Sequence, residues 1–227
     1  IMLGLESVAG RASAADQQAL WTQADHNSAQ FTHGLLRGVD GTLRSRFRWG
    51  AADVKWEATF TGGTASGMVI RLANGIDPTA AISAGVGPLK GAAYDAQRHL
   101  ITKGTVAVGQ ESWGSDPAML AVAGEPAAST YVAKGCSAAT VAPGTRLKPV
   151  AAYSVGIGDG LATVWIGEDR EDLFERMRLG DGVPAYRQTF ISPVGDPTAG
   201  RMGFKVSSPV AAADLVARQP LPFAACG

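Results

Sequence analysis

The chain has 227 residues, with 20 basic and 20 acidic side chains, so its formal net charge is zero. This balance argues against nucleic-acid binding, which depends on clustered Lys and Arg side chains. Hydrophobic residues make up 46% and charged residues 18%, a composition that excludes a disordered chain. The 29 glycines and 12 prolines indicate many turns and exclude a long helical protein. No apolar run approaches the roughly 20 residues that span a bilayer.

The N-terminal part of the chain carries few firm signals. Residues 12–14 (Ala-Ser-Ala) resemble a signal-peptidase site, but the stretch before them has no basic start and is interrupted by Glu6, which makes it a poor signal peptide. Residues 15–24 predict a short helix capped by Asp16. Arg44, Arg46 and Arg48 recur with a period of two, which predicts the solvated face of a strand rather than an anion site.

Strict alternation over residues 53–60 predicts a half-buried strand. The apolar side, which we expect to face the core, consists of Val54, Trp56, Ala58 and Phe60, and the polar side of Lys55, Glu57 and Thr59. Residues 61–64 (Thr-Gly-Gly-Thr) supply a tight turn, and Met68, Ile70 and Leu72 line one face of the next strand. Together these segments predict a hairpin.

Further strands follow at regular spacing. Residues 73–91 and 115–125 predict surface loops, and the predicted strands are residues 104–109, a segment near Tyr131, and residues 147–157, 161–167, 185–191 and 201–207. Residues 158–160 (Gly-Asp-Gly) predict a second hairpin turn. Residues 168–179 fit one helical turn or a loop with apolar anchors. A shared Thr-Val-x-apolar-Gly pattern at Thr105 and Thr163 indicates two strands with similar glycine turns rather than a repeat protein.

This pattern predicts an all-β fold, an antiparallel β-sandwich of jelly-roll or lectin-like type with one or two short helices. We expect a single core. The predicted organisation is an N-terminal extension with a short helix at residues 1–42, a β-sandwich domain at 43–208 and a C-terminal tail at 209–227.

Cys136 and Cys226 leave two interpretations open. They fit one disulfide that ties the C-terminal tail to the body, and they fit two buried thiols in a reducing compartment equally well. The position of Cys226, almost at the end of the chain, slightly favours the disulfide. With it we favour an extracellular or luminal location.

No catalytic, metal or cofactor motif stands out. The glycines of residues 156–160 are followed by a strand rather than the helix that a dinucleotide site needs. His26, His33 and His99 are too few and too scattered for a metal site. Acid pairs such as Glu57 with Glu111, or Asp159 with Glu168, have the residue types of a glycosidase, but the sequence does not give their separation. We therefore predict no metal and no cofactor.

Trp113 lies in the polar, turn-rich segment 110–117 (Gln-Glu-Ser-Trp-Gly-Ser-Asp-Pro). An exposed indole there would stack on a sugar ring while Glu111 and Asp116 hydrogen-bond its hydroxyl groups. The simpler alternative is a loop anchor packed at the edge of the core. Trp113, Glu111 and Asp116 are the candidate ligand-binding residues.

Several segments of the second half share a family pattern. They are residues 153–168, Phe174, residues 181–184 (Asp-Gly-Val-Pro), residues 190–192 and residues 200–204 (Gly-Arg-Met-Gly-Phe). This pattern resembles the second half of the farnesoic acid O-methyltransferase-like domain, and residues 54–72 are similar to its first strands. The resemblance implies a β-sandwich of the kind found in surface and recognition proteins, without methyl transfer.

The leading hypothesis is a non-enzymatic recognition domain that binds a carbohydrate or a protein partner. The first alternative is a structural subunit of a larger assembly, whose apolar termini pack on neighbouring chains. The second is a sandwich-fold polysaccharide hydrolase or lyase that uses carboxylates in a cleft.

Overall fold

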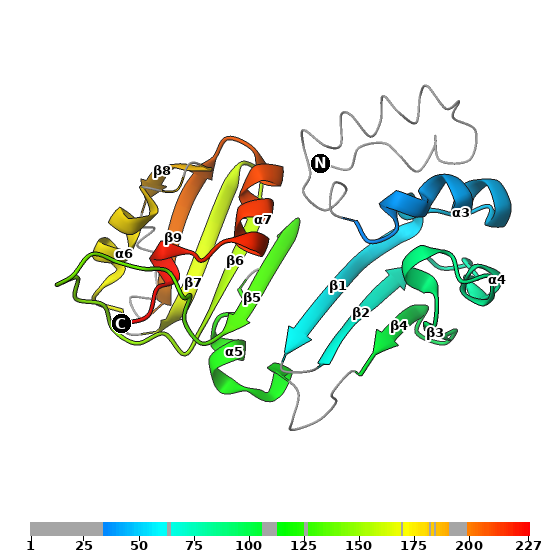
Figure 1. Ribbon diagram of the computed structural model, residues 1–227, viewed down its shortest axis with the longest axis horizontal. Helices are drawn as coiled ribbons and strands as arrows, with labels where there is room; N and C mark the ends of the chain where they lie inside the picture. Colours follow the sequence, from blue (N-terminus) through cyan, green and yellow to red (C-terminus); the bar gives the residue numbers. More distant parts are fainter. Residues whose placement is uncertain are drawn as a thin grey trace. The chain divides into compact units, whose positions relative to one another are not determined.

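The structure is a computed structural model, and it describes residues 34–62, 65–105, 113–124, 127–168, 170–181, 183, 185–190 and 199–227. These residues form two antiparallel sheets with a few short helices, which confirms the all-β class (Figure 1). The sheets belong to two compact units, here called unit 1 (described residues 34–105) and unit 2 (described residues 113–227). The predicted helix at residues 15–24 lies outside the described residues.

Unit 1 contains a four-stranded sheet, sheet A, in the order β1-β2-β4-β3. Its helices and strands are η2 (Arg37–Val39), α3 (Asp40–Phe47), η3 (Ala51–Asp53), β1 (Val54–Gly62), β2 (Ala65–Leu72), α4 (Thr79–Ser83), η4 (Gly87–Leu89), β3 (Ala93–Asp95) and β4 (Leu100–Gly104). The first predicted hairpin is confirmed, because β1 and β2 pair antiparallel across the predicted turn.

Unit 2 contains a five-stranded sheet, sheet B, in the order β5-β6-β7-β9-β8. Its helices and strands are η6 (Trp113–Ser115), α5 (Pro117–Ala121), β5 (Ser129–Lys134), β6 (Ala152–Gly158), β7 (Leu161–Glu168), α6 (Leu173–Gly180), β8 (Tyr186–Phe190), β9 (Ala199–Val206), α7 (Pro209–Arg218) and η7 (Pro222–Ala224). The second hairpin is also confirmed. Asp159 and Gly160 both have positive φ, 50° and 75°, as a two-residue type I′ turn requires.

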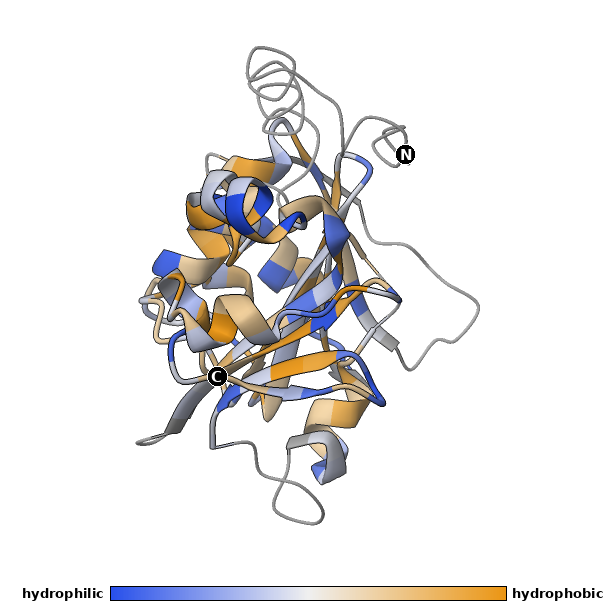
Figure 2. Cartoon of the chain, turned by 90° about the vertical axis from the view of Figure 1, so that its right-hand side faces the viewer, coloured by the Kyte–Doolittle hydropathy of each residue, from blue (hydrophilic) through white to orange (hydrophobic). Residues whose placement is uncertain are grey.

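Each unit has its own core, whereas the sequence indicated one. In unit 1, α3 and α4 contribute Leu43 and Ala81 to a cluster with Ile70 of the sheet. In unit 2, α7 packs Ala212 and Val216 against the other sheet. The helices in Figure 2 carry hydrophobic and hydrophilic segments side by side, as expected when one face is buried. Each sheet therefore covers one apolar face with helices of its own unit, and a sandwich or jelly-roll packing stays a prediction.

Helices replace several predicted loops and one predicted strand. The arginine-rich segment is helical in α3, where Arg44 Nε pairs with Asp40 Oδ2 one turn earlier at 2.9 Å. This (i, i+4) pair favours the helix that the period-two interpretation missed. The predicted loops 73–91 and 115–125 contain α4 and α5, so the described residues hold more helices than the one or two expected. β4 spans Leu100–Gly104, and residues 106–109 of the strand predicted at 104–109 lie outside the described residues.

The disulfide between Cys136 and Cys226 is present, which confirms the favoured interpretation of the two cysteines. It joins residues 90 positions apart and fastens the chain's last segment to the region after β5. Next to it, Ser137 Oγ accepts a hydrogen bond from Leu221 N at 2.6 Å, and Ser137 N donates to Ala224 O at 2.8 Å. The predicted C-terminal tail is thus part of unit 2, with Leu221 and Phe223 fully buried.

Candidate functional site

The face of sheet A that points away from the core is the best-defined candidate surface; we call it the outer face of sheet A. Paired residues on neighbouring antiparallel strands point to the same side, so the strand register defines its rows. The first row contains Trp56, Arg71, Leu100 and Asp95, the second Ala58, Val69, Thr102 and Ala93, and the third Phe60, Gly67 and Gly104. The intervening residues Met68, Ile70, Leu72 and Ile101 are buried in the core.

Trp56 lies on this outer face because β1 is irregular at its start. Val54 pairs with Leu72, Trp56 pairs with Arg71, and the register shifts between the two pairs. One extra residue in a bulge moves the following side chains to the opposite face. The prediction that Trp56 packs with the core is therefore wrong: the residue is 47% exposed.

The ring of Phe60, at the other end of β1, lies close to Gly67 of β2. A Cβ atom added to Gly67 would collide with the Phe60 ring and with Lys103 O. The glycine therefore leaves room for the ring over β2. Trp56 and Phe60 are four residues apart on one strand, about 13 Å along it, with the small side chain of Ala58 between them. The result is a shallow strip with an aromatic residue at each end.

Arg71 supplies the positive charge of this strip. It lies directly opposite Trp56, and Nη1 of its guanidinium is buried without a hydrogen-bond partner. Within the part of the chain that the structure describes, no carboxylate forms an ion pair with Arg71. Asp95, in the same row, is engaged by the backbone N–H groups of Gln97 and Arg98. An uncompensated guanidinium beside an exposed indole favours a ligand that has both an apolar face and an acidic group.

Glu57, one member of a predicted acid pair, points to the opposite side of sheet A. Its two carboxylate oxygens accept the backbone N–H of Leu35 at 2.9 and 3.1 Å. Burial raises the pKa of Glu57, and the hydrogen bond from Leu35 opposes that shift. Its predicted partner Glu111 lies outside the described residues. In the pair of Asp159 with Glu168, the Glu168 side chain is likewise outside the description.

Of the predicted ligand residues, Asp116 alone has a described side chain. Asp116 caps α5 by accepting the N–H of Ala118 at 3.0 Å, and it pairs with Lys134 Nζ at 2.6 Å. The hydrogen bond with Lys134 holds the pKa of Asp116 below its usual value. Trp113 begins η6, but its side chain is not described, and Glu111 lies in the segment 106–112 that the structure leaves out. The ligand role of these three residues stays a prediction.

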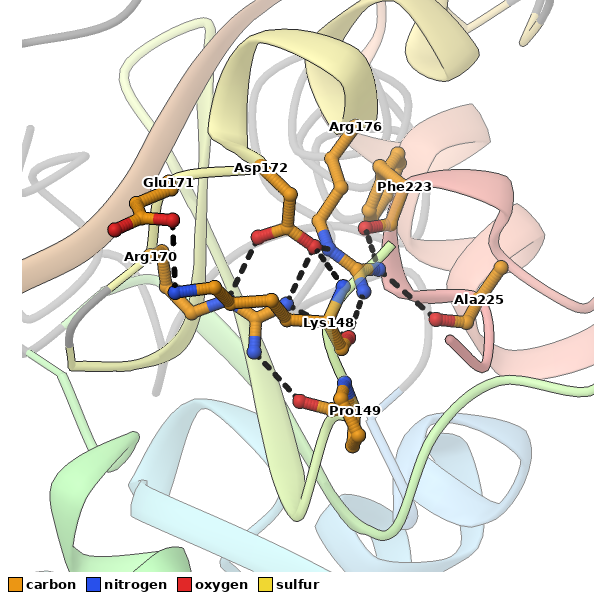
Figure 3. Close-up of polar contacts among 8 residues, drawn as sticks. All are labelled: Lys148, Pro149, Arg170, Glu171, Asp172, Arg176, Phe223 and Ala225. Atoms are coloured by element: carbon orange, nitrogen blue, oxygen red, sulfur yellow. Dashed lines mark hydrogen bonds and ion pairs between the residues drawn. The ribbon is translucent and has the colours of Figure 1, made fainter. Parts of the chain in front are cut away.

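Unit 2 contains a buried charge network around α6 (Figure 3). Asp172 accepts hydrogen bonds from Arg170 Nη2 at 2.7 Å and from Arg176 Nε at 2.8 Å, and also from the backbone N–H of Lys148 at 2.7 Å. Arg176 is fully buried and donates to the carbonyl oxygens of Phe223, Ala225 and Lys148. Every described partner is a neighbouring part of unit 2, so the network holds the C-terminal segment and α6 together rather than forming an open site.

The pKa of Asp172 follows from this arrangement. Burial alone would raise it, but the hydrogen bonds from Lys148 and Arg170 and the charge of Arg176 outweigh burial and lower the pKa. Residues 168–179 predicted one helical turn or a loop with apolar anchors, without a buried charge network. The (i, i+4) spacing of Asp172 and Arg176 was the available signal, but their burial depends on η7, which is distant in sequence.

Among the described residues, no group of three or more His, Cys, Asp or Glu side chains is arranged to hold a metal ion. His99 ends a turn with φ of 51°, and its Nδ1 lies 3.3 Å from the hydroxyl of Tyr94. No helix within the described ranges is both long and apolar enough to cross a membrane.

Comparisons with protein-family models, with curated proteins and with solved structures found no match to this chain.

Proposed function

We propose that the chain is a non-enzymatic recognition protein that binds a carbohydrate on the outer face of sheet A. One observation carries the proposal: the exposed indole of Trp56 lies directly opposite Arg71, whose charge has no carboxylate partner among the described residues. An indole face stacks on the C–H face of a sugar ring, while a guanidinium donates paired hydrogen bonds to a carboxylate.

The second aromatic residue supports an extended ligand. Phe60 is half-buried against Gly67, and it is separated from Trp56 by about 13 Å of strand. This length exceeds a single sugar ring, so the strip suits a short oligosaccharide better than a monosaccharide.

The expected location, the family resemblance and the hydrolase alternative each bear on this proposal. The disulfide is typical of an oxidising compartment, which agrees with an extracellular or luminal protein that meets glycans. The resemblance to the farnesoic acid O-methyltransferase-like domain, with its sandwich architecture and recognition role, remains part of the proposal. The hydrolase alternative loses support at Glu57, because both carboxylate oxygens of this residue bond to Leu35.

The test is binding of the full chain to an array of neutral and acidic oligosaccharides. Replacement of Trp56 by Ala should reduce binding at least tenfold, because aromatic anchors dominate such surfaces. Phe174→Ala is the matched control, since this residue of α6 is also an exposed aromatic side chain, at 58%, and its loss should leave binding unchanged.

Three outcomes would contradict the proposal. Loss of binding in Trp113→Ala with full binding in Trp56→Ala would transfer the site to the segment predicted from the sequence. Binding to none of the glycans would exclude the carbohydrate. A self-associated wild type that Trp56→Ala converts to monomer, as measured by light scattering, would assign the outer face of sheet A to a protein interface and favour the structural-subunit alternative.

A further inference from the structure

Sheets A and B share one connectivity. In unit 1 the hairpin β1-β2 is followed by α4, β3 and β4, and the spatial order is β1-β2-β4-β3. In unit 2 the hairpin β6-β7 is followed by α6, β8 and β9, and four neighbouring strands have the order β6-β7-β9-β8. Each unit therefore contains the same ββαββ motif, with its fourth strand inserted beside its second (Figure 1).

The two motifs also bury the same side. In each, the second and third strands run parallel with the fourth between them, and such a crossover is right-handed in nearly all proteins. Its helix packs on the core side in both units, with Ala81 of α4 in the core of unit 1 and Leu173 and Met177 of α6 against the core of unit 2. The third strand of each motif also places a tyrosine toward the core, Tyr94 in unit 1 and Tyr186 in unit 2.

Each motif carries a tryptophan directly opposite an arginine on the side away from these helices. In sheet A the pair is Trp56 with Arg71, across the first and second strands of the motif. In sheet B it is Trp165 with Arg201, across the second and fourth strands. The pairs thus differ by one strand position, but both join a central strand of the motif to its neighbour.

The second pair is already stacked. Cζ of Arg201 lies 3.6 Å from the centre of the Trp165 ring, and Nε of Arg201 is buried without a hydrogen-bond partner. Arg201 is half-buried, and in the described part of the chain no carboxylate forms an ion pair with it. On the same face, Lys205 is exposed four residues further along β9. Stacking on the indole holds the guanidinium in place, so it loses less freedom when it binds an anion.

We propose that the chain is bivalent, with one acidic-sugar site at Trp56–Arg71 and a second at Trp165–Arg201. This inference rests on the proposed function and extends it in two ways: it names an acidic glycan as the ligand class, and it assigns a site to each unit. At the second site the indole is partly covered by Met119 and Val122 from the α5 region, so the arginine supplies the larger share of recognition there.

The experiment is titration calorimetry of the full chain with tetragalacturonate, using the uncharged oligosaccharide of equal length as the comparison. The expected stoichiometry is two acidic oligosaccharides per chain, with at least tenfold weaker binding of the uncharged one. Arg201→Met and Arg71→Met should each reduce the stoichiometry to one, and the double variant should abolish binding. Arg218→Met removes an exposed arginine of α7 and should leave the stoichiometry at two.

The two proposals fail in different ways. One site per chain, lost in Arg71→Met and retained in Arg201→Met, overturns bivalency and leaves the proposed function intact. Equal binding of the acidic and the uncharged oligosaccharide overturns the acidic ligand class. Absence of binding by either probe in the calorimeter and of any glycan on the array overturns the proposed function itself. Arg201→Met could also lose binding at both sites. If its circular dichroism melt equals that of the wild type, the variant is folded and the two sites are not independent, which overturns the assignment of one site to each unit.

Discussion

Units 1 and 2 build the same ββαββ motif but close it in different ways. Unit 1 relies on apolar packing around Ile70 and on short polar contacts such as the hydrogen bond from Ala51 N to Asp40 Oδ1 at 2.6 Å. Unit 2 adds a fifth strand, the helix α7, a disulfide and the fully buried Arg176. The comparison shows that the same motif folds both without a disulfide, as in unit 1, and with one, as in unit 2. Urea titrations in which NMR signals report the two sheets separately would measure this difference in stability.

The largest effect is expected for Arg176→Met. The substitution removes one of the two arginines that pair with Asp172 and leaves the carbonyl oxygens of Phe223 and Ala225 without this donor, so unit 2 should lose about 3–5 kcal/mol of stability. Unit 1 should not change. Arg178→Met is the control, because this neighbour on α6 is exposed and its replacement should alter stability by less than about 0.5 kcal/mol. Equal loss in both units would show that the network does not belong to unit 2 alone.

Reduction of the disulfide comes next. Cys136 and Cys226 close a loop across 90 positions, and a cross-link of this kind contributes about 2–4 kcal/mol. Cys136→Ser with Cys226→Ser should lower the urea midpoint of unit 2 and leave that of unit 1 in place. A reducing agent should reproduce the effect in the wild type and have none in the double variant. An unchanged midpoint for unit 2 would mean that Arg176 and Ser137 hold the C-terminal segment without the disulfide.

Much of this architecture follows from local sequence patterns, and the rest does not. The two hairpins were predictable because alternation and the Gly-Asp-Gly turn are local signals, and β8 and β9 were found in the same way. The face of Trp56 was not, because a single bulged residue near Lys55 inverts every later side chain of the strand. A period-two pattern defines two faces, but which one is buried depends on α3 and α4.

The candidate sites were harder to predict than the fold. The pairing of Trp165 with Arg201 and that of Trp56 with Arg71 join residues from different strands, so their proximity depends on register. The sequence did not reveal the common ββαββ motif either, because the Thr-Val-x-apolar-Gly pattern shared by Thr105 and Thr163 does not fall on equivalent strands of the two units. Thr163 lies in the second strand of its motif, whereas Thr105 follows the fourth strand of the other.

Gly67→Ala tests the outer face of sheet A with a smaller expected effect. The added methyl group would meet the Phe60 ring and Lys103 O, so the ring must move or the strands must separate. We expect unit 1 to lose about 1–3 kcal/mol, as overpacked sites do, with weaker glycan binding. Gly62→Ala is matched in residue type and sheet, and a Cβ there meets nothing within 4 Å. A destabilisation of the same size in both variants would exclude the ring contact as the cause.

The smallest expected effect is on the pH dependence of stability. As the pH rises, Asp172 should stabilise unit 2, whereas Glu57 should destabilise unit 1. Asp172 has a lowered pKa in the folded state, so its contribution is complete above the unfolded pKa of about 3.9 and is lost as the pH falls through the lower folded value. Glu57 has a raised pKa through burial, so the folded unit 1 binds the proton more tightly than the unfolded chain. Unit 1 should therefore lose that contribution as the pH rises from about 4.3 through the folded pKa of Glu57.

Urea midpoints of each sheet between about pH 3 and pH 7 would show this contrast directly. Asp172→Asn should reduce the fall of the unit 2 midpoint in acid. Glu57→Gln should reduce the fall of the unit 1 midpoint as the pH rises. Neither substitution should change the midpoint of the other unit. Because Glu57 and Ile70 share the core side of sheet A, an acid-stabilised unit 1 would also confirm that β1 turns its charged residue inward and Trp56 outward. A pH dependence of unit 1 that Glu57→Gln leaves unchanged would contradict the inward placement of Glu57, and with it the basis for an exposed Trp56.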